Sequence, residues 1–129
     1  MHKALAARKK QRQAGIHLAK QYTRRLKSIL GSLCAVLCGS FARGDFNLGS
    51  DVDVLIISDS LPPHPLARMK FLYRYVEGEI EPKGYRREEF SRMLSSNNPI
   101  AVDAFKNGIV LIDDGFWMRL KRDYSNKRG

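Results

Sequence analysis

The sequence contains little cysteine, no long apolar segment and, in its first quarter, no acidic residue. Cys34 and Cys38 are the two cysteines, and their even spacing in an apolar run places both on one face of a strand. No second group of Cys or His completes a metal-ligand set, so we expect reduced thiols in the core. No apolar run approaches the about 20 residues that span a bilayer, and the N-terminal residues include no apolar stretch of the kind found in a secretory signal, so we expect none. We therefore expect a cytoplasmic protein without disulfides or membrane contact.

Positive charge is concentrated at the N-terminus of a chain of 129 residues with a formal net charge of +10. Residues 1–31 hold nine basic residues, namely Lys3, Arg8, Lys9, Lys10, Arg12, Lys20, Arg24, Arg25 and Lys27. The remainder holds 14 basic and 13 acidic residues and is almost neutral. We expect residues 1–14 to form a basic arm or a solvated helix extension, and residues 15–129 to form a single domain.

Apolar periodicity and turn residues divide the chain into helices and strands. We expect helices at residues 15–30, 66–75, 88–94, 100–105 and 114–124, and strands at residues 33–38, 52–57, 76–81 and 108–112. Residues 39–50 are expected to form a polar connection, and Pro82 to end the third strand. Asp113 and Asp114 are expected to cap the last helix. This order predicts an α/β (α+β) fold with a small mixed sheet flanked by helices.

Two aspartates stand at the start of the second expected strand. Asp51 and Asp53 are two residues apart, so on a strand their side chains project together while Val52, Val54 and Ile56 face the core. Such a pair repels itself, whereas a divalent cation reverses the sign of the interaction. All-oxygen ligation favours Mg²⁺ or Mn²⁺. We therefore predict that Asp51 and Asp53 bind metal.

Gly39 and Ser40 end the preceding strand and supply a complementary feature. A glycine at this point lets a phosphate approach the backbone closely, and a serine at the start of the next turn points its hydroxyl and neighbouring N–H groups at an anion. Arg43, three residues later, either adds positive charge to this phosphate seat or is a solvated loop residue.

The segments Gly39–Asp45 (GSFARGD) and Ser50–Leu55 (SDVDVL) together resemble the GS-x10-DxD signature of the DNA polymerase β nucleotidyltransferase superfamily. The resemblance covers roughly residues 26–94, and the short chain is similar to the minimal nucleotidyltransferases of that superfamily. It implies a polymerase β palm-like fold in which Asp51 and Asp53 hold two divalent metal ions, while Gly39 and Ser40 bind the phosphates of an NTP.

The same resemblance implies a third carboxylate on a later strand. Glu81 is the first choice, because the segment Ile80–Tyr85 (IEPKGY) is similar to the place where family members carry it. Glu79, on the same face of the expected strand, is the alternative. The commoner residue in the family is aspartate, and a longer glutamate can either bind metal or act as a base toward an acceptor hydroxyl.

The resemblance implies transfer of a nucleoside monophosphate, expected to be AMP from ATP, to an acceptor with release of pyrophosphate. The chain leaves no room for an acceptor-binding domain, so we expect a partner, a homo-oligomer or the acceptor itself to supply that surface. It resembles enzymes that modify small helical HEPN-type proteins encoded beside them, as in toxin–antitoxin pairs. The alternative is a catalytically inactive domain of the same fold that binds nucleic acid through its basic N-terminus.

Overall fold

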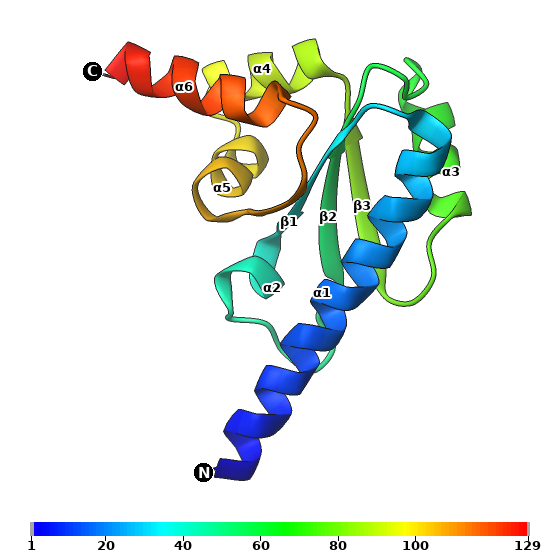
Figure 1. Cartoon of the computed structure of the whole chain (residues 1–129), viewed down its shortest axis with the longest axis vertical. Helices are drawn as coiled ribbons and strands as arrows, with labels where there is room; N and C mark the ends of the chain where they lie inside the picture. The colour runs from blue at the N-terminus through cyan, green and yellow to red at the C-terminus, as the bar shows by residue number, and fades with distance from the viewer. Residues whose placement is uncertain (1, 129) are drawn as a thin grey trace.

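The computed structural model describes residues 2–128 and places a mixed four-stranded sheet at the centre of that part of the chain (Figure 1). The strands are β1 (Cys34–Cys38), β2 (Val52–Ile57), β3 (Ile80–Tyr85) and β4 (Ile109–Ile112), in the order β3-β2-β1-β4. β1 runs antiparallel to both β2 and β4, whereas β2 and β3 are parallel.

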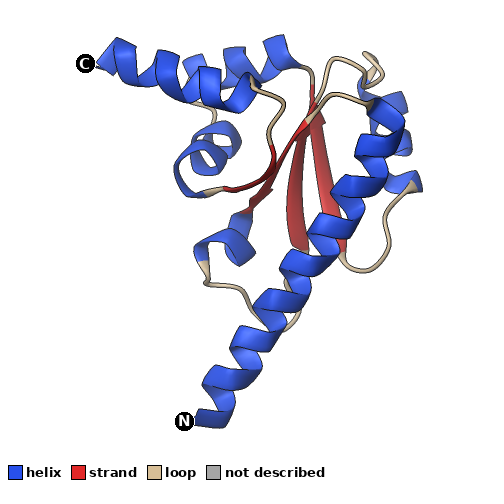
Figure 2. Cartoon of the chain, viewed as in Figure 1, coloured by secondary structure: helices blue, strands red, loops and turns tan. Residues whose placement is uncertain are grey.

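Helices cover both faces of this sheet, as Figure 2 shows. α1 (His2–Leu30) and α3 (Pro65–Arg74) pack on one face, and α4 (Arg87–Ser95), α5 (Pro99–Asn107) and α6 (Phe116–Arg128) pack on the other. A short helix, α2 (Gly39–Arg43), follows β1 directly. The expected α/β architecture is confirmed. None of the helices in residues 2–128 combines the length and apolarity needed to cross a membrane.

The strand β2 shows why its sequence is almost continuously apolar. Val54 and Ile56 are buried against α1 and α3, while Leu55 and Ile57 are buried against the helices of the opposite face. A strand covered on both faces has no solvent side that would require alternating polar residues. Asp53 therefore stands out as the polar position within β2.

The third strand differs from the expectation. It was expected at residues 76–81 with Pro82 as its end, but β3 spans Ile80–Tyr85 and includes Pro82. β3 lies at the edge of the sheet and pairs with β2 alone, so a residue without an N–H is tolerated there. The shift brings Lys83 into the strand and leaves Glu79 just before it.

The first helix is longer than its apolar pattern suggests, because α1 begins at His2 rather than near residue 15. One face of α1 contains the buried residues Ala19, Tyr22 and Leu26. At the same helical spacing, this face continues toward the N-terminus through Gly15 and Arg12. Gly15 lies against the ring of Phe41 in α2: an added Cβ would lie 2.6 Å from the ring atom Cε1. A small residue therefore lets α1 approach α2 closely.

Asp113 and Asp114 join α6 to the end of β1, as well as capping α6 as expected. Asp113 accepts from the backbone N–H groups of Gly115, Trp117 and Met118, and Asp114 accepts from that of Phe116. The side chain of Asp114 is 13% exposed and bonds the Ser32 hydroxyl at 2.6 Å and the Arg87 guanidinium at 2.7 Å. The Cys34 thiol also donates to it, at 3.1 Å.

We predict that Asp114→Ala lowers the free energy of unfolding by about 2–4 kcal/mol at pH 7, because it leaves Arg87 and Ser32 without their acceptor. Burial raises the pKa of Asp114, but hydrogen bonds from Ser32, Cys34 and Arg87 outweigh this effect and hold the pKa below its usual range. The stabilisation is therefore full above about pH 4 and is lost as the pH falls through the folded pKa.

Urea denaturation of the unaltered protein and of Asp114→Ala, at pH 7 and at progressively lower pH, measures the difference in their free energies of unfolding. The exposed carboxylate Asp123, also on α6, supplies the control variant Asp123→Ala. Equal losses of stability in the two variants would contradict the conclusion that Asp114 fastens α6 to the core.

Candidate active site

The candidate site is built around two carboxylates that the sheet places side by side. Asp53 in β2 pairs in register with Glu81 in the parallel neighbour β3, and with Cys38 in the antiparallel neighbour β1. Asp53 lies on the same face of β2 as Leu55 and Ile57, beyond the end of the apolar core. Two acidic side chains are thus adjacent at the beginning of both parallel strands.

The environment of Asp53 disfavours its charged form. Burial raises the pKa of the Asp53 carboxyl most; the positive charge of Lys83 lowers it, and the charge and hydrogen bond of Glu81 raise it again. The charge of Asp51 raises it further. The net result is a pKa above the ordinary value. Burial, reinforced by two neighbouring acids, therefore outweighs the favourable charge of Lys83.

Gly39 closes the other side of Asp53. Its φ is +67°, in the left-handed region that favours glycine, and an added Cβ would collide with the carboxylate oxygen Oδ2 of Asp53. Gly39 is the first residue of α2 and directly follows Cys38, which is opposite Asp53. The predicted phosphate seat and the predicted metal ligand are therefore in direct contact.

The other predicted site residues lie around this pair. Asp51 is exposed and directly precedes β2, and Ser40 is half-buried in the first turn of α2. Arg43 is held by two carboxylates, with its Nε 3.2 Å from Asp45 and its Nη1 3.0 Å from Asp103. A nucleotide would have to compete with both carboxylates for Arg43. Glu79 is exposed outside β3, and its carbonyl accepts from the N–H of Val52 at 2.8 Å.

These residues suit a divalent cation. Asp51, Asp53 and Glu81 offer oxygen ligands of the kind that Mg²⁺ and Mn²⁺ prefer, and a cation would stabilise the charged form of Asp53, which burial and the two neighbouring acids disfavour. The three are less tightly gathered than a second group. Among the described residues, ligand atoms lying within 4.8 Å of one another are found in Cys34, Asp113 and Asp114.

That second group lies at the opposite end of β1 and is already committed to the fold. The oxygens of Asp113 and Asp114 accept from backbone N–H groups of α6, and Asp114 is also paired with Arg87. Burial raises the pKa of the Cys34 thiol to about 12, so it keeps its proton. The possible ligand atoms of this second group therefore already serve as hydrogen-bond and ion-pair partners within the protein.

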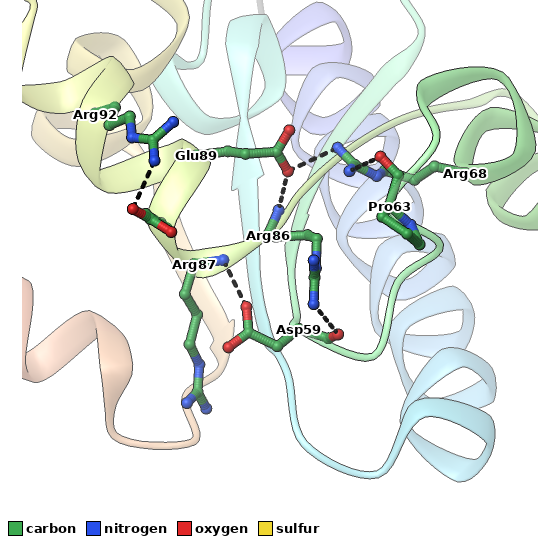
Figure 3. Close-up of a pocket in the computed structure, with 8 residues that line it drawn as sticks. Asp59, Pro63, Arg68, Arg86, Arg87, Glu89 and Arg92 are labelled. Atoms are coloured by element: carbon green, nitrogen blue, oxygen red, sulfur yellow. Dashed lines mark hydrogen bonds and ion pairs between the residues drawn. The ribbon is translucent and has the colours of Figure 1, made fainter.

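A hollow of about 460 Å³ lies at the far end of β2 and β3, beyond Ile57 and Tyr85 (Figure 3). Two of its four arginines are ion-paired with other lining residues: Arg68 with Glu89 at 2.9 Å and Arg92 with Glu88 at 2.6 Å. The remaining lining residues are Asp59, Pro63, Arg86 and Arg87. The Arg68–Glu89 pair joins α3 to α4, and the hollow is separated from Asp53 by the length of β2.

Lys83 is a site residue that the sequence analysis missed. It lies two residues after Glu81, on the same face of β3, and its charge lowers the pKa of Asp53. The alternation of Glu81 and Lys83 indicates this residue once the strand is known to continue through Pro82.

Comparisons with known proteins assign the family. Residues 19–122 match the family model of the nucleotidyltransferase domain, so the chain belongs to that family, as the sequence analysis predicted. The fold is similar to a crystal structure from Sulfolobus solfataricus described as a candidate nucleotidyltransferase, with a TM-score of 0.65 and 20% sequence identity. The similarity covers 83% of this chain and 87% of that one. A comparison with curated proteins found no match.

We predict that Asp53→Asn raises the melting temperature by a few degrees at pH 7 without divalent metal. A carboxyl whose pKa is raised by folding stabilises the protein fully below the unfolded pKa, near 4, and this contribution is lost as the pH rises through the folded pKa. The asparagine has the same size and no charge, so it avoids this loss.

Thermal unfolding followed by circular dichroism between pH 4 and pH 8 measures the effect. The advantage of the variant should grow with pH across this window. A variant that is less stable than the unaltered protein at pH 7 would contradict the conclusion that folding disfavours the charged carboxylate of Asp53.

Proposed function

We propose that the protein is a metal-dependent nucleotidyltransferase that moves a nucleoside monophosphate, AMP from ATP, to an acceptor and releases pyrophosphate. The observation that carries the proposal is the position of Asp53, which pairs in register with Glu81 on one side and lies against Gly39 on the other. Membership of the nucleotidyltransferase family supports the reaction class.

In the proposed reaction an acceptor oxygen attacks the α-phosphorus of the NTP. A bond forms between these two atoms while the bond from the α-phosphorus to the oxygen bridging the β-phosphorus breaks, and pyrophosphate leaves. Asp51, Asp53 and Glu81 would hold two Mg²⁺ or Mn²⁺ ions, which supply charge neutralisation and orientation at the triphosphate. Glu81 is either the third ligand or the base that takes the acceptor proton.

The remaining residues orient the nucleotide. Gly39 and Ser40 present the backbone of the first turn of α2, where the absence of a side chain at Gly39 lets this backbone lie against the carboxylate of Asp53. Lys83 adds a positive charge on the same face. Arg43 is a weaker candidate, because Asp45 and Asp103 already hold its guanidinium. Positioning and charge neutralisation do most of the work in such a displacement.

For the acceptor we propose a protein, with a small helical HEPN-type partner as the first to test. This choice rests on the sequence resemblance to minimal nucleotidyltransferases. A second copy of the chain could also supply part of the acceptor surface. Nucleic acid is the alternative acceptor or ligand, since Lys3, Lys9 and Lys10 are exposed on the first turns of α1.

The proposal predicts Mg²⁺-dependent transfer of label from ATP carrying ³²P at the α-phosphate. The purified protein is incubated with ATP, Mg²⁺ and, in separate reactions, itself, a HEPN-type partner or an RNA oligonucleotide. Asp53→Asn should reduce labelling by at least about 100-fold, because the central ligand loses its charge. Isothermal titration without acceptor should give ATP binding to the unaltered protein that requires Mg²⁺.

Glu77→Gln provides the matched control, since Glu77 is a surface carboxylate whose side chain is 77% exposed. It should label its acceptor and bind ATP like the unaltered protein. Labelling that survives in Asp53→Asn, or the absence of any Mg²⁺-dependent ATP binding, would refute the proposed function. Binding without transfer would instead indicate that the right acceptor was missing.

A further inference from the structure

The segment between β1 and β2 carries predicted site residues at both of its ends. Gly39 and Ser40 begin it in the first turn of α2, and Asp51 ends it just before β2. Between them the chain has only one short helix and a turn closed by hydrogen bonds between Asn47 and Ser50. The position of Asp51 and of the α2 turn therefore depends on what holds the middle of the segment.

Two arginines of α1 hold it through backbone carbonyls. Arg12 donates from Nε to the carbonyl of Phe41 at 3.0 Å and from Nη2 to that of Ala42 at 2.8 Å. Arg8, one turn earlier, donates from Nη2 to the carbonyl of Gly44 at 2.7 Å. The last carbonyls of a helix lack partners within the helix, and a cation is favoured beside them.

Stacked rings reinforce these hydrogen bonds. The guanidinium of Arg8 lies 4.4 Å from the centre of the Phe46 ring, and that ring stacks on Phe41 at 4.4 Å with an angle of 4° between the planes. Phe41 in turn packs against Gly15. Both phenylalanines are almost fully buried, so α1 and the segment form one packed unit.

We propose that Arg12, supported by Arg8, is a positioning residue of the nucleotide site. Resting on the proposed function, this inference gives part of the basic N-terminus a task other than binding an external polyanion. Arg12 sets the α2 turn and the approach to Asp51 without contacting nucleotide or metal. Arg12 suits this task because its planar group bonds two successive carbonyls at once, which a lysine ammonium cannot match.

The test compares Mg²⁺–ATP binding by isothermal titration in the unaltered protein, Arg12→Ala, Arg12→Lys and Lys10→Ala. Arg12→Ala should weaken binding about tenfold, because the α2 segment loses two hydrogen bonds that hold it in place. Arg12→Lys should restore part of the loss. Lys10→Ala removes the same charge from an exposed position on the same helix and should bind like the unaltered protein.

Hydrogen exchange supplies a readout that does not depend on ATP. Amides of residues 44–51 should exchange faster in Arg12→Ala, while those of β2 keep their protection. Melting curves establish that binding is measured on folded protein, and if Arg12→Ala does not fold, Arg8→Ala and Arg12→Lys carry the comparison.

Three outcomes are distinguishable. Unaltered protein that binds ATP, with Arg12→Ala binding equally well, overturns the inference and leaves the proposed function standing. Equal losses in Arg12→Ala and Lys10→Ala also overturn it, because charge alone would then account for the effect. Unaltered protein that binds no ATP with Mg²⁺ refutes the proposed function, and the inference with it.

Discussion

The parallel pairing of β2 with β3 is the constraint on which the site depends. It sets Asp53 beside Glu81, and the antiparallel pairing of β1 on the other side of β2 brings Cys38 and Gly39 to the same end of the sheet. Three segments far apart in the sequence thus meet around one carboxylate. This arrangement destabilises the charged form of Asp53, since burial and neighbouring acids raise its pKa against the opposing effect of Lys83.

That arrangement contrasts with the opposite end of the sheet. There the carboxylates of Asp113 and Asp114 are matched by backbone N–H groups, Ser32 and Arg87, and they fasten α6 to the core. Both ends contain clustered acids, but one cluster is saturated by the protein and the other is not. Unbalanced charge beside a buried strand suits ligand binding better than it suits stability.

The sequence predicted most of the fold where the apolar pattern was unambiguous. β2 was predicted at its observed residues, because a short run rich in Val and Ile that follows turn residues favours a strand over a helix. β3 was misplaced because an edge position, which tolerates Pro82, is a property of the sheet and not of the local sequence. The same error hid Lys83 and placed Glu79 in a strand that begins after it.

The N-terminus was harder to interpret for a related reason. The face of α1 that contains Ala19, Tyr22 and Leu26 continues through Gly15, Arg12 and Arg8. None of these three is an apolar residue, although the glycine is small and the arginines have apolar stems that can pack. The pattern of apolar residues therefore ends near residue 15, whereas the packing of α1 against the rest of the protein continues beyond it. Much of the charge excess that opens the chain remains exposed, but Arg8 and Arg12 bind the segment that leads to Asp51.

The most direct test of the account is a crystal structure with Mn²⁺ and a non-hydrolysable ATP analogue. The account predicts anomalous density for Mn²⁺ among the carboxylates of Asp51, Asp53 and Glu81, with the triphosphate beside Gly39 and Ser40. Density among Cys34, Asp113 and Asp114 instead, or a nucleotide bound away from Gly39, would contradict it.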